Sequence, residues 1–324
     1  MDRVLVLTDG KAGHENQSRA FVRALGRDFD LIEVHFRSPL HKALSYLLDH
    51  LGLHTSRLFT LKAGVTGPYA AVVGTGSGTF YAAKTLARRL GTKCGVVLYP
   101  RGYRIATFDC VLAPAFDRPP SAPNVVTVPA NLVANDAAFY AAGTAAFQTR
   151  HPFPHPTHPV PAVAVIIGGP NACSSMTPDW MRTQLTRIFT EHGHPAFRPA
   201  PSGTTSPVPE FWVTTSRRTP PDVEAVVRDF PFDYRLLYSE DHFNPIPAFV
   251  SLAQTLYVTA ESTGMLSEAC TFGSADVRVL DNLNPGPHKF RRFAESCAAL
   301  GAKKIDLSAP FAAARHLLGL DARA

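Results

Sequence analysis

The chain has 324 residues, of which 45% are hydrophobic and 18% are charged. This apolar fraction excludes an intrinsically disordered chain, and the length suits about two domains with cores of their own. No apolar run approaches the roughly 18 residues of a membrane-spanning helix, and the four-residue run after Arg3 predicts no signal peptide. Five cysteines without a CxxC pair predict free buried thiols in a reducing compartment, so we expect a cytoplasmic protein.

Positive charge is concentrated in the first half of the chain. Residues 1–150 have 17 Lys and Arg against 10 Asp and Glu, whereas residues 151–324 have 15 against 16. A net charge of +7 on one half predicts an anionic partner there, such as a phospholipid surface or a phosphorylated acceptor. A basic domain without such a partner is equally compatible with the charge. Nucleic acid is a third anionic partner that charge alone allows, and we expect none.

In the first half, short apolar runs alternate with helical patterns. Strands are predicted at residues 3–7, 30–36, 69–73, 94–98 and 110–112, with helices at about 15–27 and ending near 90. Continuous apolar strands separated by helices are typical of a parallel sheet that is covered on both faces.

Between Arg118 and Pro161 prolines become dense, and the segment ends in HPFPHPTHPVP (151–161). Because proline lacks a backbone N–H and fixes φ, we expect an extended linker here, with the hinge at 151–161. His151, His155 and His158 have a spacing that suggests a metal site. The prolines exclude the helix that would align these rings, so a linker is favoured and no metal is expected.

After the linker the alternation resumes. Strands are predicted at 162–167, 210–214, 234–238, 256–259 and 277–280, and helices at 178–191, 221–229, 247–253 and 264–272. The sequence therefore predicts two α/β domains, 1–150 and 162–287, with C-terminal helices in 288–324 that pack back on the first domain. Ligands of such sheets bind at the carboxyl ends of strands, here expected in the cleft between the domains.

Leucines mark one face of a further helix in the first half, and polar residues mark the opposite face. The leucines are Leu40, Leu44, Leu47, Leu48 and Leu51; the polar residues are His41, Lys42, Ser45 and Asp49. We expect this apolar side of the helix to pack on the sheet, and a peripheral membrane contact is the alternative.

Two loops after strands of the first half are candidate sites. The segment DGKAGHENQ (9–17) follows the first strand and opens the first helix. Gly10 and Gly13 would let backbone amides approach a ligand, and His14, or failing that Asp9, is placed to act as a base. A capped turn without function is the alternative. A second loop either cradles an anion or only permits a tight turn; its residues are Gly76, Ser77 and Gly78.

Three loops of the second half are expected to converge on the phosphates of a nucleotide. Gly168 and Gly169 end one strand, where small residues let a phosphate approach the backbone. Arg217, beside Ser216, follows the next strand and could bind a diphosphate through two hydrogen bonds, unless it is a solvated surface residue. A third loop opens a helix and offers hydroxyls and free amides; its residues are Ser262, Thr263, Gly264 and Met265. Glu268, two turns on, could hold both hydroxyls of a ribose.

Several familiar signatures are incomplete. GTGSGT (74–79) lacks the third glycine of a dinucleotide-binding fingerprint, and no GK[ST] motif is present. HENQS (14–18) has no second histidine for a zinc protease site. Ser77 has Thr75 two residues before it, so it does not form a GxSxG nucleophile elbow. These absences argue against the hydrolase, ATPase and zinc-protease classes.

Eight segments spread over nearly the whole chain carry a family resemblance: DGKAGHENQ (9–17), GTGSGT (74–79), FDCVLAPAFD (108–117), IIGGP (166–170), VTTSRRTP (213–220), FNPIPAF (243–249), VTAESTGMLSEAC (258–270) and HKFRRF (288–293). Together they resemble the elongated-mitochondria (mitochondrial fission) family, whose many bacterial members are assigned as glycosyltransferases. The resemblance implies a GT-B-like α/β fold, with two Rossmann-like domains whose parallel sheets face a central cleft.

The resemblance also implies roles for single residues. Glu268 corresponds to the ribose-binding acid of the donor site, and residues 262–265 to its phosphate loop. His14 is similar to the glycine-loop histidine of transferases that act on lipid-linked acceptors. The chain departs from the family at Glu261, where Asp is usual, and at Gly273-Ser274-Ala275, where a Gly-Lys-Pro turn is usual.

Residues and resemblance together predict a GT-B-type glycosyltransferase that needs neither metal nor cofactor. It would move a sugar from a nucleotide-activated donor, bound by the second half, to an envelope glycolipid or polysaccharide acceptor bound by the basic first half. The alternatives are a non-catalytic adaptor of the mitochondrial-fission type and a nucleotide-sugar epimerase. We expect a cytoplasmic enzyme that is peripheral at the inner face of the membrane.

Overall fold

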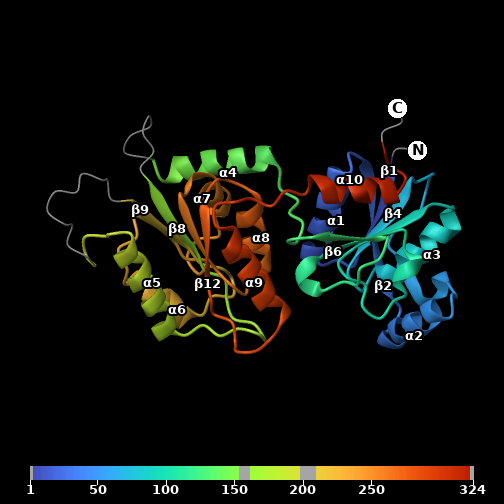
Figure 1. Ribbon diagram of the computed structural model, residues 1–324, viewed down its shortest axis with the longest axis horizontal. Coiled ribbons are helices and arrows are strands. Elements are labelled where there is room, and N and C mark those ends of the chain that lie inside the picture. Colours follow the sequence, from blue (N-terminus) through green and yellow to red (C-terminus); the bar gives the residue numbers. More distant parts are fainter. Residues whose placement is uncertain (1–2, 153–160, 198–208, 322–324) are drawn as a thin grey trace. The chain divides into compact units, whose positions relative to one another are not determined.

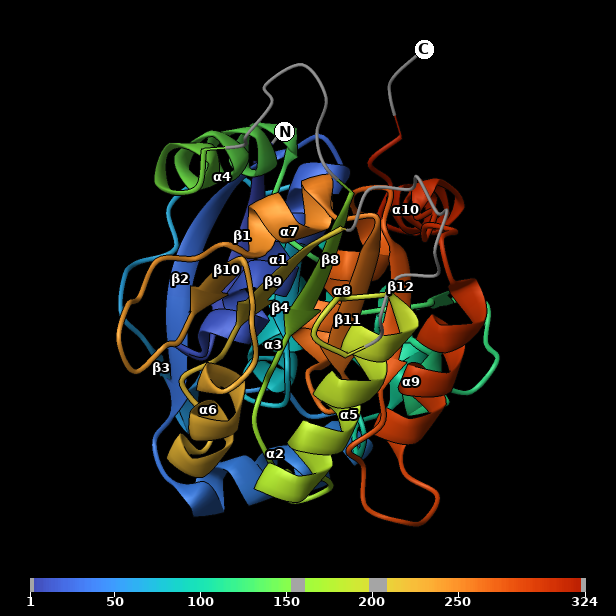
Figure 2. The ribbon, with the colours of Figure 1, turned by 90° about the vertical axis from the view of Figure 1, so that its left-hand side faces the viewer.

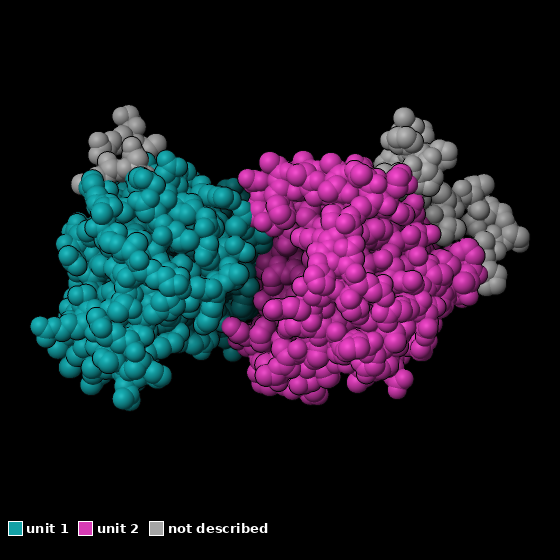
Figure 3. Space-filling model, turned by 180° about the vertical axis from the view of Figure 1, so that it is seen from behind, with its two compact units in different colours: residues 1–134, 306–324 teal, residues 135–305 magenta. Residues whose placement is uncertain are grey.

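The computed structural model describes residues 3–152, 161–197 and 209–321. The chain divides into two compact units (Figure 3). Unit 1 comprises Met1–Ala134 and Asp306–Ala324, and unit 2 comprises Asn135–Ile305. Most of the predicted hinge at 151–161, with His155 and His158, lies outside the described residues.

Unit 1 is built on a seven-stranded sheet in the order β3-β2-β1-β4-β5-β6-β7 (Figure 1). The strands are β1 (Arg3–Thr8), β2 (Asp28–Phe36), β3 (Phe59–Leu61), β4 (Ala71–Thr75), β5 (Lys93–Val97), β6 (Cys110–Pro114) and β7 (Val125–Val128). All neighbours are parallel except β2 and β3, so a short antiparallel edge strand is added to the predicted parallel sheet.

Helices cover both faces of this sheet, as continuous apolar strands require. Along β1, Val4 and Val6 face α1 (Ala12–Ala24) and α10 (Ser308–Leu317). Leu5 and Leu7 face α3 (Phe80–Leu90), and α2 (Pro39–His50) lies beside α3. The alternation of side chains along one strand thus builds two separate hydrophobic layers.

Unit 2 contains a five-stranded, wholly parallel sheet in the order β10-β9-β8-β11-β12, visible from left to right in Figure 2. The strands are β8 (Ala162–Ile166), β9 (Glu210–Thr214), β10 (Tyr234–Leu236), β11 (Thr255–Thr259) and β12 (Asp276–Leu280). The helices are α4 (Ala137–Arg150), α5 (Pro178–Glu191), α6 (Pro221–Arg228), α7 (Ile246–Leu252), α8 (Thr263–Thr271) and α9 (Lys289–Leu300).

The helices of unit 2 also pack on both faces. Helices α5 and α6 cover one face through Leu185 and Val223. On the other face, Phe147 of α4 and Phe249 of α7 pack against each other and against Trp212 of β9. The prediction of two Rossmann-like α/β halves, the organisation of GT-B-like proteins, is confirmed for each unit taken by itself.

The prediction of an extended linker from Arg118 to Pro161 is wrong. Strand β7 and the whole of α4 lie within this segment. Its prolines fall into two groups, and none lies between Pro129 and Pro152. The proline-free stretch forms a helix that Asp136 caps by accepting a hydrogen bond from the N–H of Phe139 at 2.9 Å.

The expected orientation of α2 is also wrong. Leu40 and Leu47 are 81% and 57% exposed, whereas Ser45 and Asp49 on the opposite face are fully buried. The polar face points inward because it finds partners there. The carboxylate of Asp49 lies 2.6 Å from the ammonium of Lys84, and the Ser45 hydroxyl lies 2.9 Å from that of Tyr103.

The terminal helices are shared between the units. Helix α9 packs on β12 and α8 and belongs to unit 2, whereas α10 belongs to unit 1. Arg315 of α10 donates to the carbonyl of Ala24 at 3.0 Å, and Arg27 donates to the carbonyl of Leu320 at 2.9 Å. Among the helices of the described residues, none combines the length and the apolar character that crossing a bilayer requires.

Candidate functional site

Each unit has one point at which the strand order reverses. In unit 1 this point lies between β1 and β4, and in unit 2 between β8 and β11. The helices after the two strands lie on opposite faces: α1 and α3 in unit 1, and α5 and α8 in unit 2. The loops therefore part in opposite directions, and such points are where open α/β sheets bind ligands. Four of the five predicted site loops follow these four strands, and the fifth, with Ser216 and Arg217, follows β9 next to β8.

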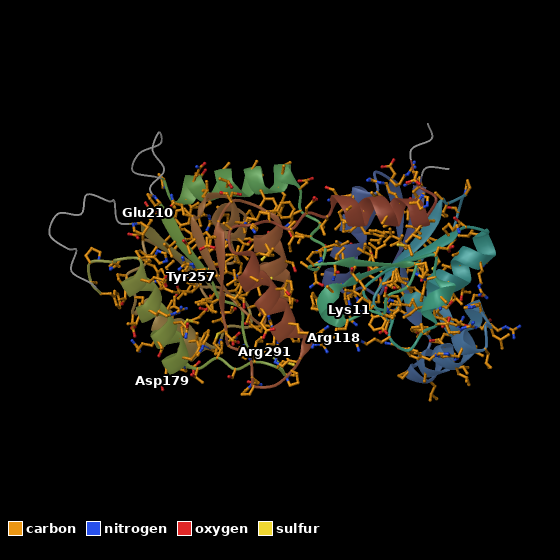
Figure 4. All side chains as sticks on the ribbon, viewed as in Figure 1. Lys11, Arg118, Asp179, Glu210, Tyr257 and Arg291 are labelled. Carbon is orange, nitrogen blue, oxygen red and sulfur yellow. The ribbon has the colours of Figure 1, made fainter. Side chains whose placement is uncertain are left out.

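In unit 1, the structure brings the two candidate bases together. Nδ1 of His14 lies 3.0 and 3.1 Å from the carboxylate oxygens of Asp9. The Lys11 ammonium, labelled in Figure 4, lies 3.4 Å from the same carboxylate. Burial disfavours the charged form of Asp9, but the charges and hydrogen bonds of His14 and Lys11 outweigh this effect and lower its pKa below the ordinary 3.8.

The glycines after β4 let this loop pack closely against the loop after β1. A Cβ on Gly76 would lie 2.3 Å from Cε1 of His14, and a Cβ on Gly78 would lie 2.7 Å from Cβ of Asp9. Gly76 also has a φ of +81°, which favours glycine. The β4 loop therefore packs directly against the side chains of Asp9 and His14.

The remaining loop residues of unit 1 differ in their surroundings. Gly10 has a φ of +78°, and a Cβ there would lie 3.1 Å from Oε1 of Glu33, the only residue within 4 Å among those described. Gly13 lies within α1 with nothing near its Cβ position. The Ser77 hydroxyl accepts a hydrogen bond from the ammonium of Lys42 at 2.9 Å, which connects this loop to α2.

This geometry can support proton transfer. With Nδ1–H donated to Asp9, the other ring nitrogen of His14 carries a lone pair, and the carboxylate would stabilise the imidazolium that forms when a proton is taken up. The imidazole is 24% exposed, so a substrate hydroxyl has access to it. Sequence reasoning treats Asp9 and His14 as alternative bases, whereas in the structure they form one hydrogen-bonded pair.

In unit 2, Glu261 occupies the place expected for a ligand at the β8 loop. Its Oε1 accepts hydrogen bonds from the N–H of Gly169 at 2.7 Å and from the Thr259 hydroxyl at 3.1 Å. Gly168 makes this approach possible, because a Cβ there would lie 2.0 Å from the same oxygen. The longer acid found here in place of the usual Asp spans from β11 to β8 and takes the amide that a phosphate was expected to use.

The N-terminus of α8 remains available to an anion. Within the described residues, the backbone N–H groups of Gly264 and Met265 have no hydrogen-bond acceptor. The Ser262 hydroxyl does not cap the helix, and no acidic residue lies in its first turn. Gly264 is open, with no atom within 4 Å of its Cβ position. Free amides at the positive end of a helix dipole favour a phosphate.

The turn after β9 packs against the β8 loop. The Thr219 hydroxyl donates to the carbonyl of Gly168 at 2.5 Å and accepts from the N–H of Ser216 at 2.9 Å. Gly169 lies against this turn, since a Cβ there would lie 2.2 Å from the carbonyl oxygen of Arg218. The exposed guanidinium of Arg217 forms no hydrogen bond or ion pair with any described residue. It is therefore a cation without an internal partner.

Glu268 lies on α8, but it already has partners. Its Oε1 accepts hydrogen bonds from the Tyr140 hydroxyl at 2.9 Å and from the Asn135 amide at 3.3 Å. Burial raises the pKa of the Glu268 carboxyl, although these two donors counteract the effect. Tyr140 and Asn135 precede the second sheet by many residues, so local pattern could not associate them with Glu268.

Two buried polar groups lie at the strand ends without a partner. Both side-chain atoms of Asn282 and Oε2 of Glu261 are buried and unpaired among the described residues. Asn282 follows β12, which pairs with β11 up to Thr259 and Leu280, so both groups lie just beyond the same strand ends. Arg291, labelled in Figure 4, holds this loop through Asp281 at 2.9 Å. Buried polar groups are normally hydrogen-bonded to protein groups or to ordered water, so these atoms are free to take a further hydrogen-bond partner.

Sequence reasoning missed Asn282, although a signal was present. The residue is the second after a predicted strand, within the stretch in which the other site loops begin. A shallow cavity of about 520 Å³ lies elsewhere in unit 2 and is lined by Tyr140, Thr144, Phe272 and Gly273, among others. No sequence-predicted site residue lines it. In the part of the chain that the structure describes, no three His, Cys, Asp or Glu side chains are grouped to hold a metal.

Similar solved structures come from several organisms. They include MurG of Acinetobacter baumannii (14% identity, 99% of this chain and 93% of that chain, TM-score 0.47). A second is the UDP-GlcNAc 2-epimerase of Neisseria meningitidis bound to UDP-GlcNAc (11% identity, 97% of this chain and 97% of that chain, TM-score 0.47). A third is Phytolacca americana UGT2 complexed with UDP-2-fluoro-glucose and pterostilbene (9% identity, 99% of this chain and 91% of that chain, TM-score 0.46). Because all three TM-scores are below 0.5, no conclusion about this chain's chemistry follows from them.

Among curated proteins, none matches this chain significantly. The sequence pattern of the mitochondrial fission ELM1 family, in contrast, matches residues 12–307. The matched range includes His14 and the β4, β8 and β11 loops, and it spans most of the chain. The resemblance found from the sequence motifs is thereby confirmed. The chain belongs to the mitochondrial fission ELM1 family.

Proposed function

We propose that this protein is a glycosyltransferase that moves a sugar from a nucleotide-activated donor to an envelope glycolipid or polysaccharide acceptor. One observation carries the proposal: the chemistry is divided between the two strand-order reversals. Unit 2 offers free amides and an unpaired cation, which suit a diphosphate. Unit 1 offers an aspartate-oriented histidine, which suits the activation of a hydroxyl.

The donor would bind at the strand ends of unit 2. The N–H groups of Gly264 and Met265 and the guanidinium of Arg217 would hold the diphosphate. Glu268 would bind the ribose hydroxyls, replacing or sharing its contact with Tyr140. Glu261 carries an acceptor oxygen that repels phosphate, so its free Oε2 and the Asn282 amide fit the hydroxyls of the sugar.

The chemical step follows from these assignments. An acceptor hydroxyl attacks the anomeric carbon of the donor sugar, and Nε2 of His14 takes the hydroxyl proton. The bond between that carbon and the diphosphate oxygen breaks. Negative charge then develops on the leaving diphosphate, where the amides of α8 and Arg217 would stabilise it without a metal ion.

Calorimetry with UDP, GDP, ADP and dTDP tests the donor site directly. We expect one of these nucleotides to bind, and Arg217→Gln to weaken that binding by about ten- to a hundredfold, the worth of a hydrogen bond to a charged group. Arg187→Gln is the matched control, because Arg187 is an exposed arginine on α5 that contacts only Gln184 among the described residues. Equal affinities in the two variants, or no binding at all, would refute the donor site.

A non-catalytic adaptor is the second candidate, and a separate observation favours it. The leucines of α2 are exposed, as in a surface that binds a partner. An adaptor requires neither a nucleotide nor the Asp9–His14 pair. It therefore predicts no nucleotide affinity and no effect of His14→Ala on partner binding, whereas the enzyme predicts both a nucleotide affinity and a loss of turnover.

A further inference from the structure

The exposed large apolar side chains of the described residues are concentrated in one place. Among the described residues, six large hydrophobic side chains are exposed, and five of them lie between residues 40 and 53. We call these five the leucine face: Leu40 (81% exposed), Leu44 (41%), Leu47 (57%), Leu51 (63%) and Leu53 (56%). The first four recur at helical spacing along α2, so they form one stripe.

Buried contacts of the opposite face of α2 hold the helix so that the leucine stripe points to the solvent. Asp49 pairs with Lys84 at 2.6 Å and accepts the N–H of Arg104 at 2.7 Å, and neither charged side chain is exposed. Tyr46 stacks on Tyr103 with a centroid distance of 4.3 Å. Burying a charged pair while exposing leucines reverses the usual arrangement, so the leucine face cannot be ascribed to poor packing.

The surroundings of the leucine face are strongly basic. Residues 37–104 include ten Lys and Arg but only one acidic residue, the buried Asp49. Three exposed arginines lie at the C-terminal end of α2. Arg88 donates to the carbonyl of Gly52 at 3.2 Å, Arg104 donates to that of His50 at 3.4 Å, and Arg57 lies in a short helix packed on α2. We call these three residues the basic rim.

We propose that the leucine face and the basic rim dock unit 1 on the surface of a lipid bilayer that contains anionic lipids. Leucines along one side of a helix enter the boundary between headgroups and acyl chains, while neighbouring arginines meet lipid phosphates. A second copy of the chain fits less well, because a symmetric contact through this patch would bring the two basic rims together.

The docking surface adjoins the candidate base. Lys42 on α2 donates to Ser77 at 2.9 Å, and the neighbouring Gly76 lies beneath the ring of His14. If the proposed function holds, the bilayer surface would thus lie near His14, where the headgroup of a lipid-linked acceptor would arrive. The docking itself does not depend on the transferase activity.

Sedimentation with vesicles of phosphatidylcholine alone and with vesicles that also contain the anionic lipid phosphatidylglycerol tests the proposal. The intact chain should bind the anionic vesicles, and salt should weaken the binding. The double variant Leu44→Gln/Leu47→Gln should bind at least tenfold more weakly, because burial of one leucine is worth about a factor of ten. Phe139→Gln is the control and should bind as the parent does, because it changes the sixth exposed large apolar residue of the described part of the chain.

A charge variant completes the test. Arg57→Gln should lower the partition onto anionic vesicles about fivefold, and Arg187→Gln should not. No binding by the parent, or equal binding by parent and leucine variant, would overturn the proposal. If the parent instead forms dimers that the leucine variant loses, the partner is a second copy and docking is refuted. Nucleotide affinity, measured on the same samples, fails or holds independently and reports on the proposed function alone.

Discussion

Replacing His14 by alanine removes an imidazole whose Nδ1 lies 3.0 and 3.1 Å from the oxygens of Asp9. If this ring is the base, the variant loses general-base catalysis, which contributes about 10²- to 10⁴-fold. That range corresponds to about 2.7–5.5 kcal/mol of barrier height. Asp9→Asn keeps the shape but loses the charge-assisted hydrogen bond, so we expect a smaller fall in kcat of about ten- to a hundredfold.

The assay compares kcat, nucleotide affinity and Tm for the parent, His14→Ala, Asp9→Asn and His316→Ala. His316 on α10 also pairs with an aspartate, Asp321 at 3.0 Å, but it is exposed and distant in sequence from the site loops. We expect nucleotide affinity within about twofold of the parent throughout, because the donor residues all belong to unit 2.

Acid stability gives an independent readout of the same pair. Because the pKa of Asp9 lies below its ordinary 3.8, its charged form contributes stability at every pH above 3.8. This contribution disappears as the pH falls through the lowered pKa, so the Tm difference between parent and Asp9→Asn should shrink there.

The kinetic comparison has its own refuting outcome. If kcat of His14→Ala stays within a few-fold of the parent while Tm is unchanged, the Asp9–His14 pair is not the base.

Three further predictions concern the remaining loops. Gly76→Ala places a Cβ 2.3 Å from the His14 ring at a positive φ, so it should lower stability by about 1–2 kcal/mol and lower kcat, whereas Gly64→Ala, with open space around it, should do neither. Glu268→Ala should weaken nucleotide binding about ten- to a hundredfold in calorimetry, and an unchanged Kd would contradict the ribose assignment. Treatment with EDTA should leave turnover intact; activity that is lost and then restored by Mn²⁺ or Mg²⁺ would contradict the metal-independent mechanism.

The sheets and their site loops could be predicted from the sequence because the determining signals are local. All five residues of β8 are apolar and buried, and Gly168 and Gly169 end the apolar run one residue later, after Ile167. Helix α5 begins at Pro178 with Thr177 as its cap, and it spans the predicted 178–191. A strand followed by glycine and polar residues marks a strand end, and parallel topology brings such ends together.

The contacts inside the candidate site could not be predicted, because they join distant residues. The bond from Gly169 to Glu261 spans 92 residues, and that from Asn135 to Glu268 spans 133. Each is decided by side-chain length and by what packs nearby, neither of which a local pattern encodes. Helix α4 could not be predicted for a different reason. The prolines on both sides of it dominate the composition of residues 118–161, although the helix itself contains none.

The orientation of α2 shows why an apolar periodicity does not fix which face of a helix is buried. The polar face is buried because Asp49 meets Lys84, whose ammonium also lies 3.9 Å from the ring centre of Phe108. We predict that Asp49→Ala alone destabilises the fold by about 3–5 kcal/mol, since it leaves a buried cation unpaired. The double variant Asp49→Leu/Lys84→Met should cost far less than the sum of the single changes, because it removes both charges. Urea unfolding of the parent, Asp49→Leu, Lys84→Met and the double variant measures this coupling. Additive losses would mean that the pair does not hold α2, and the outward direction of its leucines would then need another cause.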